Sequence, residues 1–440
     1  MNARPSNLRW LLIFWLFVLS AVAYLDRVNI SVAAGAMARA YGLSNIQLGW
    51  VFSAFLVGYA LFQTVAGSLA RTFGPRRVLA AGVFWWGIFT ALTASIPAGM
   101  GGALFLLLAV RFLLGAGEAV VYPASNQFIA HWIPRQERGI ANGWIFAGVG
   151  AGAGFAPPLV TYMAIRHGWR SSFWLCATLG FLAGSVWYLL ARDTPAEHPR
   201  VSRLERDNPR AGLDVGAQRS SSSDWLPWRV ILKSKDVWAV TLSYFCYGYV
   251  AWIYFSWFYI YLAQARGLNL KASAFYAMLP FIAMAICCLL GGTVNDRLSK
   301  QYGLRVGRSI LASISILGAG AFLALGAEVA SARFASLVLA GGAGALYLSQ
   351  SSFWSVTVDI AGTHAGPVSG FMNMANQIGG AVTSSLTPVI AKHFGWTASF
   401  LVAAGLCGLG ALAWLAVDPE RRLLRPAPQL RGAAALRSER

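Results

Sequence analysis

The sequence predicts an all-α integral membrane protein with about twelve transmembrane helices. Of its 440 residues, 57% are hydrophobic and only 12% are charged, whereas an ordinary soluble domain is about 25% charged. The mean hydropathy is +0.57. Apolar runs of about 20 residues, the length that crosses the hydrocarbon core of a bilayer, recur along the whole chain.

The predicted spans fall into two sets of six. In the first half they lie near 10–37, 46–70, 77–97, 102–130, 138–164 and 171–191, and in the second near 236–264, 273–295, 308–327, 332–358, 366–391 and 398–417. Several exceed the minimum length, so tilted helices are expected. The first span follows Arg4 and Arg9 in the manner of a signal peptide. We interpret it as a retained helix.

The net charge of +19 raises the question of nucleic-acid binding. Its distribution argues against that function. The basic residues gather in alternate loops, as Arg71, Arg76 and Arg77, then Arg135 and Arg138, then Arg297, Lys300, Arg305 and Arg308. This positive-inside bias predicts that both termini are in the cytoplasm. An even number of spans also requires that the two termini lie on the same side. We expect a multi-pass protein of a bacterial inner membrane.

The chain divides around a polar segment. We expect an N-terminal six-helix bundle at 1–193, a cytoplasmic linker rich in Pro, Ser and Arg at 194–230, a C-terminal bundle at 231–420 and a basic cytoplasmic tail at 421–440. The halves are similar: RGIANGWIFAGVGAGAG from 138 aligns with AGPVSGFMNMANQIGGA from 365, and GWRSSF aligns with GWTASF. Such a repeat predicts two parallel, pseudo-symmetric bundles with a binding site between them.

Several stretches resemble one known family. These are YLDRVNISVA on the first span, GYALFQTVAG on the second, RFLLGAGEAVVYPASNQFIAHWIPRQERGIANG on the fourth and fifth, and SFWSVTVDIAGTHAGPVSGFMNMANQIGG in the second half. They resemble the anion:cation symporter family of the major facilitator superfamily (MFS), which includes sugar-acid carriers and sialin-type transporters. The resemblance implies the MFS fold and import of an organic anion, driven by protons or sodium.

One signature of the superfamily is incomplete. The loop after the second span usually reads G-x-x-x-D-R-x-G-R-R, and here Arg71 stands where the Asp is expected. The resemblance assigns a gating role to this loop and to its copy in the second half, namely to Gly67, Gly74, Arg76, Asp296 and Arg297. Loss of the acid leaves the first-half gate as an open question.

Asp26 and Arg27 lie about sixteen residues into the first span. Ionisable residues at membrane depth are costly and usually face the interior of the bundle. Neighbours on a helix point about 100° apart, so each is expected to have a different partner. Arg27 cannot lose its charge, and its planar fork suits a carboxylate; the resemblance implies the same substrate-binding role. A static salt bridge is the alternative.

The fourth span carries Arg111, Gly115, Glu118 and Tyr122 on one face. Glu118 precedes an apolar stretch, AVVYPA, where a carboxyl group is harder to ionise than in water. Glu118 and Asp26 are therefore the candidate proton carriers, and Arg111 is expected to hold one of them ionised until substrate arrives. A static Arg111–Glu118 pair is the alternative.

Neutral polar residues are candidates for binding the parts of the substrate other than its anionic group. They are Tyr59 and Gln63 on the second span, Tyr247 and Tyr254 on the seventh, Ser351 and Trp354 on the tenth, and Asn373, Asn376 and Gln377 on the eleventh. Hydrogen bonds between helices would equally explain them. Val149 aligns with Asn376, and sugar-acid carriers of the resembled family tend to have Gln near that position. Val149 therefore leaves room for a more apolar substrate, such as an aromatic acid.

The leading interpretation is a monomeric proton symporter of a small organic anion, with alternating access, the lipid bilayer as its surroundings and no cofactor or metal. A sodium-coupled symporter or exchanger of an aromatic or dicarboxylic acid is an alternative. A membrane enzyme is disfavoured because no P-loop, H-E-x-x-H or G-x-S-x-G motif occurs. A non-transporting sensor on the same scaffold would need a larger cytoplasmic domain than the linker provides.

Overall fold

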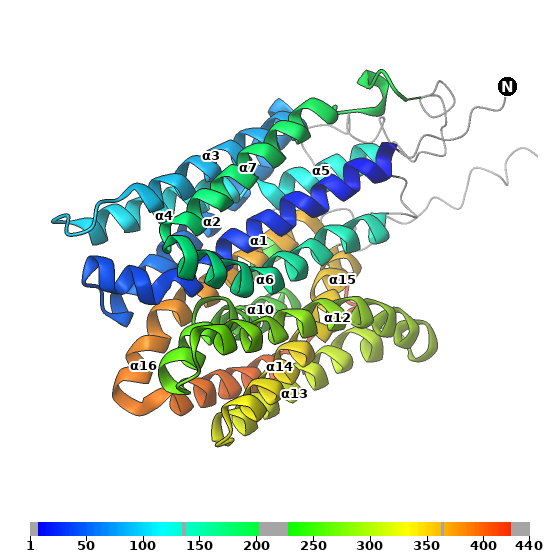
Figure 1. The fold of residues 1–440 in the computed structure, drawn as a ribbon. Helices are drawn as coiled ribbons and strands as arrows, with labels where there is room; N and C mark the ends of the chain where they lie inside the picture. Colours follow the sequence, from blue (N-terminus) through cyan, green and yellow to red (C-terminus); the bar gives the residue numbers. More distant parts are fainter. Residues whose placement is uncertain (1–7, 134–137, 202–227, 362–364, 424–440) are drawn as a thin grey trace, which may run out of the picture.

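The computed structural model describes residues 8–133, 138–201, 228–361 and 365–423. Within these ranges the secondary structure is helical, without strands (Figure 1). The N-terminal half contains α1 (Leu8–Tyr41), α2 (Asn45–Phe73), α3 (Pro75–Ser95), α4 (Ala103–Glu118), α5 (Val121–Trp132), α6 (Arg138–His167) and α7 (Arg170–Leu190). The C-terminal half contains α10 (Lys235–Ser256), α11 (Phe258–Ile260), α12 (Leu270–Tyr302), α13 (Leu311–Glu328), α14 (Ala332–Leu348), α15 (Gln350–Ala361) and α16 (Ala365–Leu415).

The predicted twelve spans can be counted in these helices. Ten segments of the described chain are long and apolar enough to cross a membrane. One of them, α16, joins two helices across Gly395, whose φ of 82° lies in the left-handed region that favours glycine. A further helix, α10, is absent from the ten because it is rich in Tyr and Trp, yet nearly all of it is buried. The count of spans is therefore twelve, made up of the ten segments, the second helix of α16 and α10.

The fourth span of each half is interrupted midway, which the sequence analysis did not predict. In the first half α4 ends at Glu118 and α5 begins at Val121. Pro123 has no N–H, so the carbonyl of Ala119 lacks its usual i+4 donor. In the second half α14 ends at Leu348 and α15 begins at Gln350. The first interruption places Glu118 at a helix end in the middle of the bundle.

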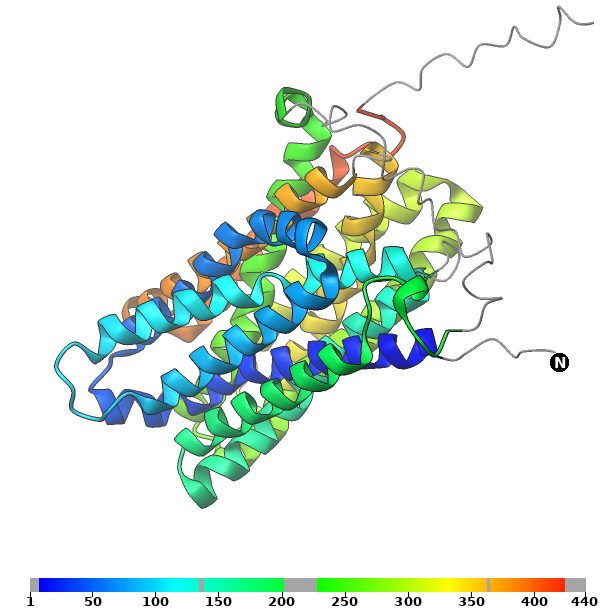
Figure 2. The same ribbon diagram turned by 90° about the horizontal axis from the view of Figure 1, so that it is seen from above.

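The repeat seen in the sequence recurs in the packing. Within the first half α1 packs on α6, α2 on α4 and α3 on α7; within the second, α10 packs on α16, α12 on α14 and α13 on α16. The two halves meet where α2 lies against α16 and where α6 lies against α12. Figure 1 shows the first group of helices above the second, and Figure 2 shows the first group in front of the second. This arrangement leaves α1, α6, α10 and α12 around the centre.

The described chain begins and ends at the same end of the molecule (Figure 2). There the carboxylate of Asp236, at the start of α10, accepts a hydrogen bond of 2.9 Å from the Asp418 amide and pairs with Arg421 at 3.1 Å. Of the expected linker, the structure describes a short 3-10 helix, Pro195–Glu197, and α9 (Trp228–Lys233). Residues 202–227 and the tail from 424 lie outside the described residues, as does Arg135.

Two glycines of α6 bring it close to α1. A Cβ at Gly148 would overlap the carbonyl oxygen of Phe17, and one at Gly152 would overlap that of Ala21. The Gly-rich stretch therefore permits close packing of α6 on α1. By contrast, a Cβ at Gly154 would find its nearest atom 3.9 Å away, on Phe281.

Replacing Gly152 with alanine is therefore expected to destabilise the first half. The new methyl group must push α1 and α6 apart, and such overpacking costs about 1–3 kcal/mol. The melting temperature of the detergent-solubilised protein should fall. Gly154→Ala, two positions along the same helix, is the matched control and should melt like the wild type. Equal melting of both variants would show that α1 and α6 are not packed as described.

Candidate functional site

A cavity lies between the two halves. Its wall consists of Tyr24, Phe146, Val149, Gly150 and Ala153 from the first half, and Phe255, Phe281, Met284, Ala285, Cys288, Tyr347 and Gln350 from the second. The first group comes from α1 and α6, the second from α10, α12, α14 and α15. The cavity therefore sits where the repeat predicts a binding site, and movement of one half against the other would change its shape.

Arg27 and Glu118 form a buried ion pair beside this cavity. The Arg27 Nε donates to the Glu118 Oε1 at 2.6 Å, and both side chains are at most 1% exposed. Three aromatic rings flank the guanidinium: its central carbon lies 4.5 Å from the centre of Tyr24, 4.7 Å from Tyr59 and 5.3 Å from Phe55. One terminal nitrogen of Arg27 and the Glu118 Oε2 have no hydrogen-bond partner among the described residues.

Asp26 has a different partner, as the angle between helix neighbours predicts. The Thr90 hydroxyl on α3 donates to the Asp26 Oδ2 at 2.8 Å. The side chain is buried and is not on the cavity wall. Its Oδ1 finds no partner within the described chain. Asp26 thus belongs to the same buried cluster as Arg27 but lies on its far side.

Among the ion pairs of the described residues, Arg111 does not pair with Glu118, which was the alternative to its expected role of holding Asp26 or Glu118 ionised. That expected role stays a prediction. Its guanidinium carbon lies 5.0 Å from the centre of the Phe55 ring. Its Nε and one terminal nitrogen have no hydrogen-bond partner in the described part of the chain. Arg27 reaches Glu118 first because α1 presents it directly to the end of α4. Arg111 remains a buried cation of the cluster without a fixed acidic partner in those residues.

The cluster reaches the cavity through Tyr24. None of Asp26, Arg27, Arg111 and Glu118 is on the cavity wall, whereas Tyr24 both lines the cavity and covers the Arg27 guanidinium. Tyr24 therefore connects the cavity wall to the buried cluster. Tyr24 was not among the predicted site residues, although it stands two residues before Asp26 in the motif that carries the resemblance.

The predicted tyrosines are distributed differently from expectation. Tyr59 lies against Arg27, and Gln63 is on the same helix with its side-chain oxygen buried and without a partner among the described residues. Tyr247 packs against Tyr347 of the wall, with the rings tilted by 45° and their centres 5.6 Å apart. Tyr254 donates to the Leu339 carbonyl at 2.8 Å. Its hydroxyl therefore faces α14, and neither Tyr247 nor Tyr254 lines the cavity.

The remaining neutral candidates lie near the wall but not on it. Trp354 contacts Phe146 of the other half, with ring centres 6.4 Å apart. The buried side-chain polar atoms of Ser351, Trp354, Asn376 and Gln377 include some that have no partner in the described part of the chain. Asn376 packs against Gly248, and Asn373 is half-buried on the same face of α16. These groups remain candidates for substrate contact after rearrangement.

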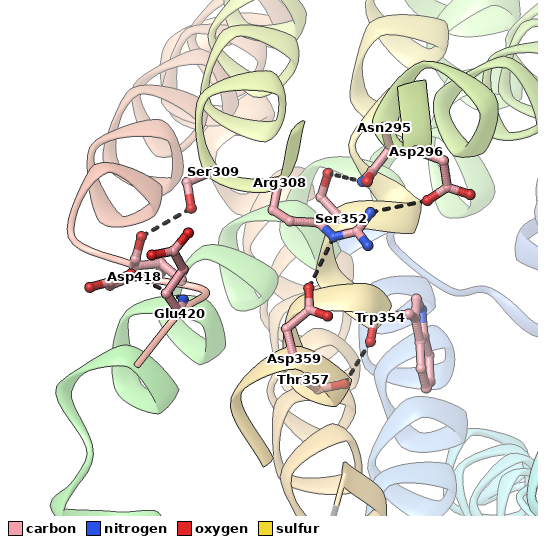
Figure 3. A network of polar contacts seen from close by, with 11 residues as sticks. Asn295, Asp296, Arg308, Ser309, Ser352, Trp354, Thr357, Asp359, Asp418 and Glu420 are labelled. Atoms are coloured by element: carbon pink, nitrogen blue, oxygen red, sulfur yellow. Dashed lines mark hydrogen bonds and ion pairs between the residues drawn. The ribbon is translucent and has the colours of Figure 1, made fainter. Parts of the chain in front are cut away.

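In the second-half gating loop, the arginine that forms ion pairs is Arg308 and not the predicted Arg297. Arg308 lies between two acids, 3.3 Å from Asp296 and 3.0 Å from Asp359 (Figure 3). Arg297, in contrast, is exposed. Behind the cluster Asn295 donates to the Ser352 hydroxyl at 2.8 Å. The cluster connects α12 to α15 through Arg308, which precedes α13.

In the first half, an acid from elsewhere meets the gating loop. The Asp193 carboxylate accepts a 2.8 Å hydrogen bond from the Arg76 amide at the start of α3. It also lies against Gly74, whose φ of 84° requires glycine. Arg76 in turn donates to the Tyr188 carbonyl at 2.7 Å. Asp193 thus caps α3 next to a loop that lacks the usual Asp; the side chains at 67 and 71 lie outside what the structure describes.

Removing this cap is expected to loosen the loop. Asp193→Ala deletes the acceptor at the α3 N-terminus, and loss of an N-cap costs about 1 kcal/mol. Proteolysis of the native protein at the α2–α3 connection, followed by mass spectrometry, should be faster in the variant. Glu197→Ala, an exposed acid four residues away, is the control. Equal cleavage rates in both variants would contradict the capping role.

The halves are joined at the end that carries the α1–α2 connection. Asn45 donates to Gln264 at 3.0 Å, Ser53 contacts Ser385 at 2.7 Å, and Thr161 contacts Tyr259 at 3.2 Å. Each bond links one half to the other. Gly49 of α2 adds a close approach to the backbone of α16 at Ser384. This end of the molecule is therefore closed.

A cavity between two repeated helical halves, with buried ionisable side chains beside it, is the architecture of a secondary transporter. No group of three or more His, Cys, Asp or Glu in the described residues is placed to hold a metal ion. Comparison with known families is specific. Residues 16–384, and again 305–438, match the Major Facilitator Superfamily, and the chain belongs to that superfamily. Its members are membrane transporters and not enzymes.

Curated relatives are anion transporters. The chain is 34% identical over 400 residues to the probable sulfoacetate transporter SauU of Cupriavidus necator, covering 90% of this chain and 91% of the relative. It is 32% identical over 417 residues to the chloroplastic ascorbate transporter of Arabidopsis thaliana, covering 92% and 74%. It is 26% identical over 406 residues to the hexuronate transporter of Bacillus subtilis, covering 91% and 92%.

Solved structures show the same fold. A bacterial homologue of the human lysosomal transporter Spinster, in an inward-facing and unoccupied conformation, aligns with a TM-score of 0.75 at 16% identity, over 96% of this chain and 100% of that one. Its inward-facing, occupied form gives a TM-score of 0.73 at 16% identity, over 94% and 97%. The expected multi-pass, all-α MFS fold is confirmed.

Proposed function

We propose that this protein imports a small organic anion together with a proton, by alternating access across the inner membrane of a bacterium. The observation that carries the proposal is the buried Arg27–Glu118 pair next to a cavity between the halves. The similarity to a probable sulfoacetate transporter, an ascorbate transporter and a hexuronate transporter supports an anionic substrate.

The coupling follows from competition for Arg27. With the cavity empty, Glu118 neutralises Arg27, and both charges are out of contact with water. A substrate carboxylate that displaces Tyr24 and binds Arg27 would leave Glu118 as an unpaired buried anion, which is costly. Taking up a proton removes that cost. Anion binding and protonation of Glu118 therefore favour each other. The charges of Asp26 and Arg111, in the same cluster, affect how readily Glu118 takes up a proton.

The remaining parts of the proposal concern orientation and assembly. The protein works as a monomer of two bundles, 1–193 and 231–420, with the linker, the tail and both termini in the cytoplasm. In this orientation the Asn45–Gln264, Ser53–Ser385 and Thr161–Tyr259 contacts seal the outward end. The gating loops around Asp193 and Arg308 then lie on the cytoplasmic side, where the halves separate and close in turn.

Uptake into proteoliposomes tests this function. Purified protein is reconstituted, and accumulation of sugar acids, dicarboxylates and aromatic acids is measured with an inward proton gradient, with an inward sodium gradient and with neither. Accumulation of at least one anion under the proton gradient alone is the expected result. A response to sodium only would refute proton coupling, and no movement of any anion would refute transport of this substrate class.

A further inference from the structure

The cavity wall offers few hydrogen-bonding groups. Five of its residues are aromatic, namely Tyr24, Phe146, Phe255, Phe281 and Tyr347. The polar side-chain groups on the wall are two phenol hydroxyls, one thiol and the amide of Gln350. That amide already donates to the Tyr244 hydroxyl at 3.0 Å, so its oxygen remains available. A sugar acid with four ring hydroxyls would leave most of them unpaired against such a wall.

The same surroundings offer apolar and aromatic contacts to a ligand ring. Phe255 lies 5.0 Å from Phe281 and 5.5 Å from Tyr24, measured between ring centres, at tilted or edge-on angles. These are the separations at which aromatic pairs attract. A flat ligand ring can join this cluster through its face or its edge. The cation nearest to the cluster is Arg27, directly behind Tyr24, so the ligand's carboxylate has a partner on the α1 side.

The repeat departs from symmetry at three wall positions of α6. Phe146 aligns with Asn373, Val149 with Asn376 and Gly150 with Gln377, so the second half has an amide at each of them. At 149 the side chain is aliphatic and faces the cavity from α6, opposite Phe281 and Met284 of α12. An amide there would supply both a donor and an acceptor to a substrate hydroxyl. The Val149 side chain has neither a donor nor an acceptor, and it adds apolar surface to the wall.

We infer that the substrate is an aromatic carboxylate with few hydroxyl groups, and that Val149 sets this preference against hydroxylated sugar acids. The inference rests on the proposed function and names its substrate class. Apolar sites reject an added hydroxyl by up to about 100-fold, because the hydroxyl loses its water without gaining a partner.

Benzoate and glucuronate provide a matched test, since each carries one carboxylate on a six-membered ring. Binding is measured by the shift in melting temperature of the solubilised full-length protein with ligand concentration, because neutral benzoic acid crosses bilayers unaided. The concentration that gives half of the maximal shift in melting temperature should be about 100-fold lower for benzoate than for glucuronate. Equal or tighter binding of glucuronate would overturn the inference.

Two variants of Val149 test the residue itself. Val149→Gln introduces an amide, and Val149→Met introduces an apolar side chain of similar length. The Gln variant should reduce the ratio of the half-saturating concentrations of glucuronate and benzoate about tenfold, which corresponds to one net hydrogen bond. The Met variant should leave this ratio unchanged. An equal effect of both variants would mean that size, not hydrogen bonding, matters at this position.

A third ligand separates this inference from the proposed function. Sulfoacetate is a two-carbon anion with neither a ring nor a hydroxyl group. If it binds and accumulates under a proton gradient while benzoate does not bind, the aromatic preference is overturned and proton-coupled anion transport stands. If no anion accumulates under any gradient, the proposed function itself fails.

Discussion

Replacing Glu118 with glutamine is expected to abolish proton-driven accumulation of the substrate while preserving exchange. Glutamine keeps the shape of the side chain and an oxygen that can accept the 2.6 Å hydrogen bond from Arg27. It cannot bind or release a proton. In proteoliposomes, accumulation under an imposed pH gradient should fall to the level of protein-free vesicles, whereas counterflow between internal and external substrate should remain measurable.

The comparison variant is Glu328→Gln, which alters an exposed acid at the end of α13. It should accumulate substrate like the wild type. Loss of both accumulation and counterflow in Glu118→Gln, at an unchanged melting temperature, would assign Glu118 to binding or structure. Retained accumulation would remove it from the coupling mechanism altogether.

Replacing Arg27 with alanine is expected to eliminate anion binding. The guanidinium is the cation nearest to the cavity, and its planar fork can hold a carboxylate through two hydrogen bonds. Loss of a charged, desolvated contact of this kind costs on the order of 2–5 kcal/mol, or roughly 30- to 5,000-fold in affinity. Ligand-induced stabilisation of the purified protein against heat measures this loss directly.

The single variant also leaves Glu118 buried without its partner, which is itself destabilising by about 3–5 kcal/mol. The double variant Arg27→Ala/Glu118→Gln removes that unpaired charge, so it should fold more stably than Arg27→Ala and still fail to bind. Arg333→Ala, an exposed arginine at the start of α14, should bind normally. Wild-type affinity in the folded double variant would refute the role of Arg27 as the anion clamp.

Much of the fold followed from the sequence because hydropathy and repeats are local signals. The twelve spans and the duplicated halves appear as expected. Even the divergent partners of Asp26 and Arg27 follow from the rotation per residue of a helix. The interrupted fourth span was readable in principle, since Pro123 removes a hydrogen bond five residues after Glu118.

The partners within the site were harder to predict, because they depend on how each helix is rotated against its neighbours. Periodicity places Arg111 and Glu118 on one face but does not reveal that Arg27 of α1 reaches Glu118 first. It likewise groups Tyr247 with Tyr254 without showing that Tyr254 faces the α14 backbone. Asp193 meets the α3 N-terminus from 117 residues away along the chain, a distance that no local motif spans.

The central claim is that an anion competes with Glu118 for Arg27, so that Glu118 takes up a proton when the anion binds. Proton uptake can be followed directly with a pH indicator. An anion that binds the protein is added stepwise to the solubilised protein in weakly buffered solution. The wild type should take up protons in proportion to the anion bound, and Glu118→Gln should take up none. Anion binding without proton uptake by the wild type, or equal uptake by the variant, would contradict the claim.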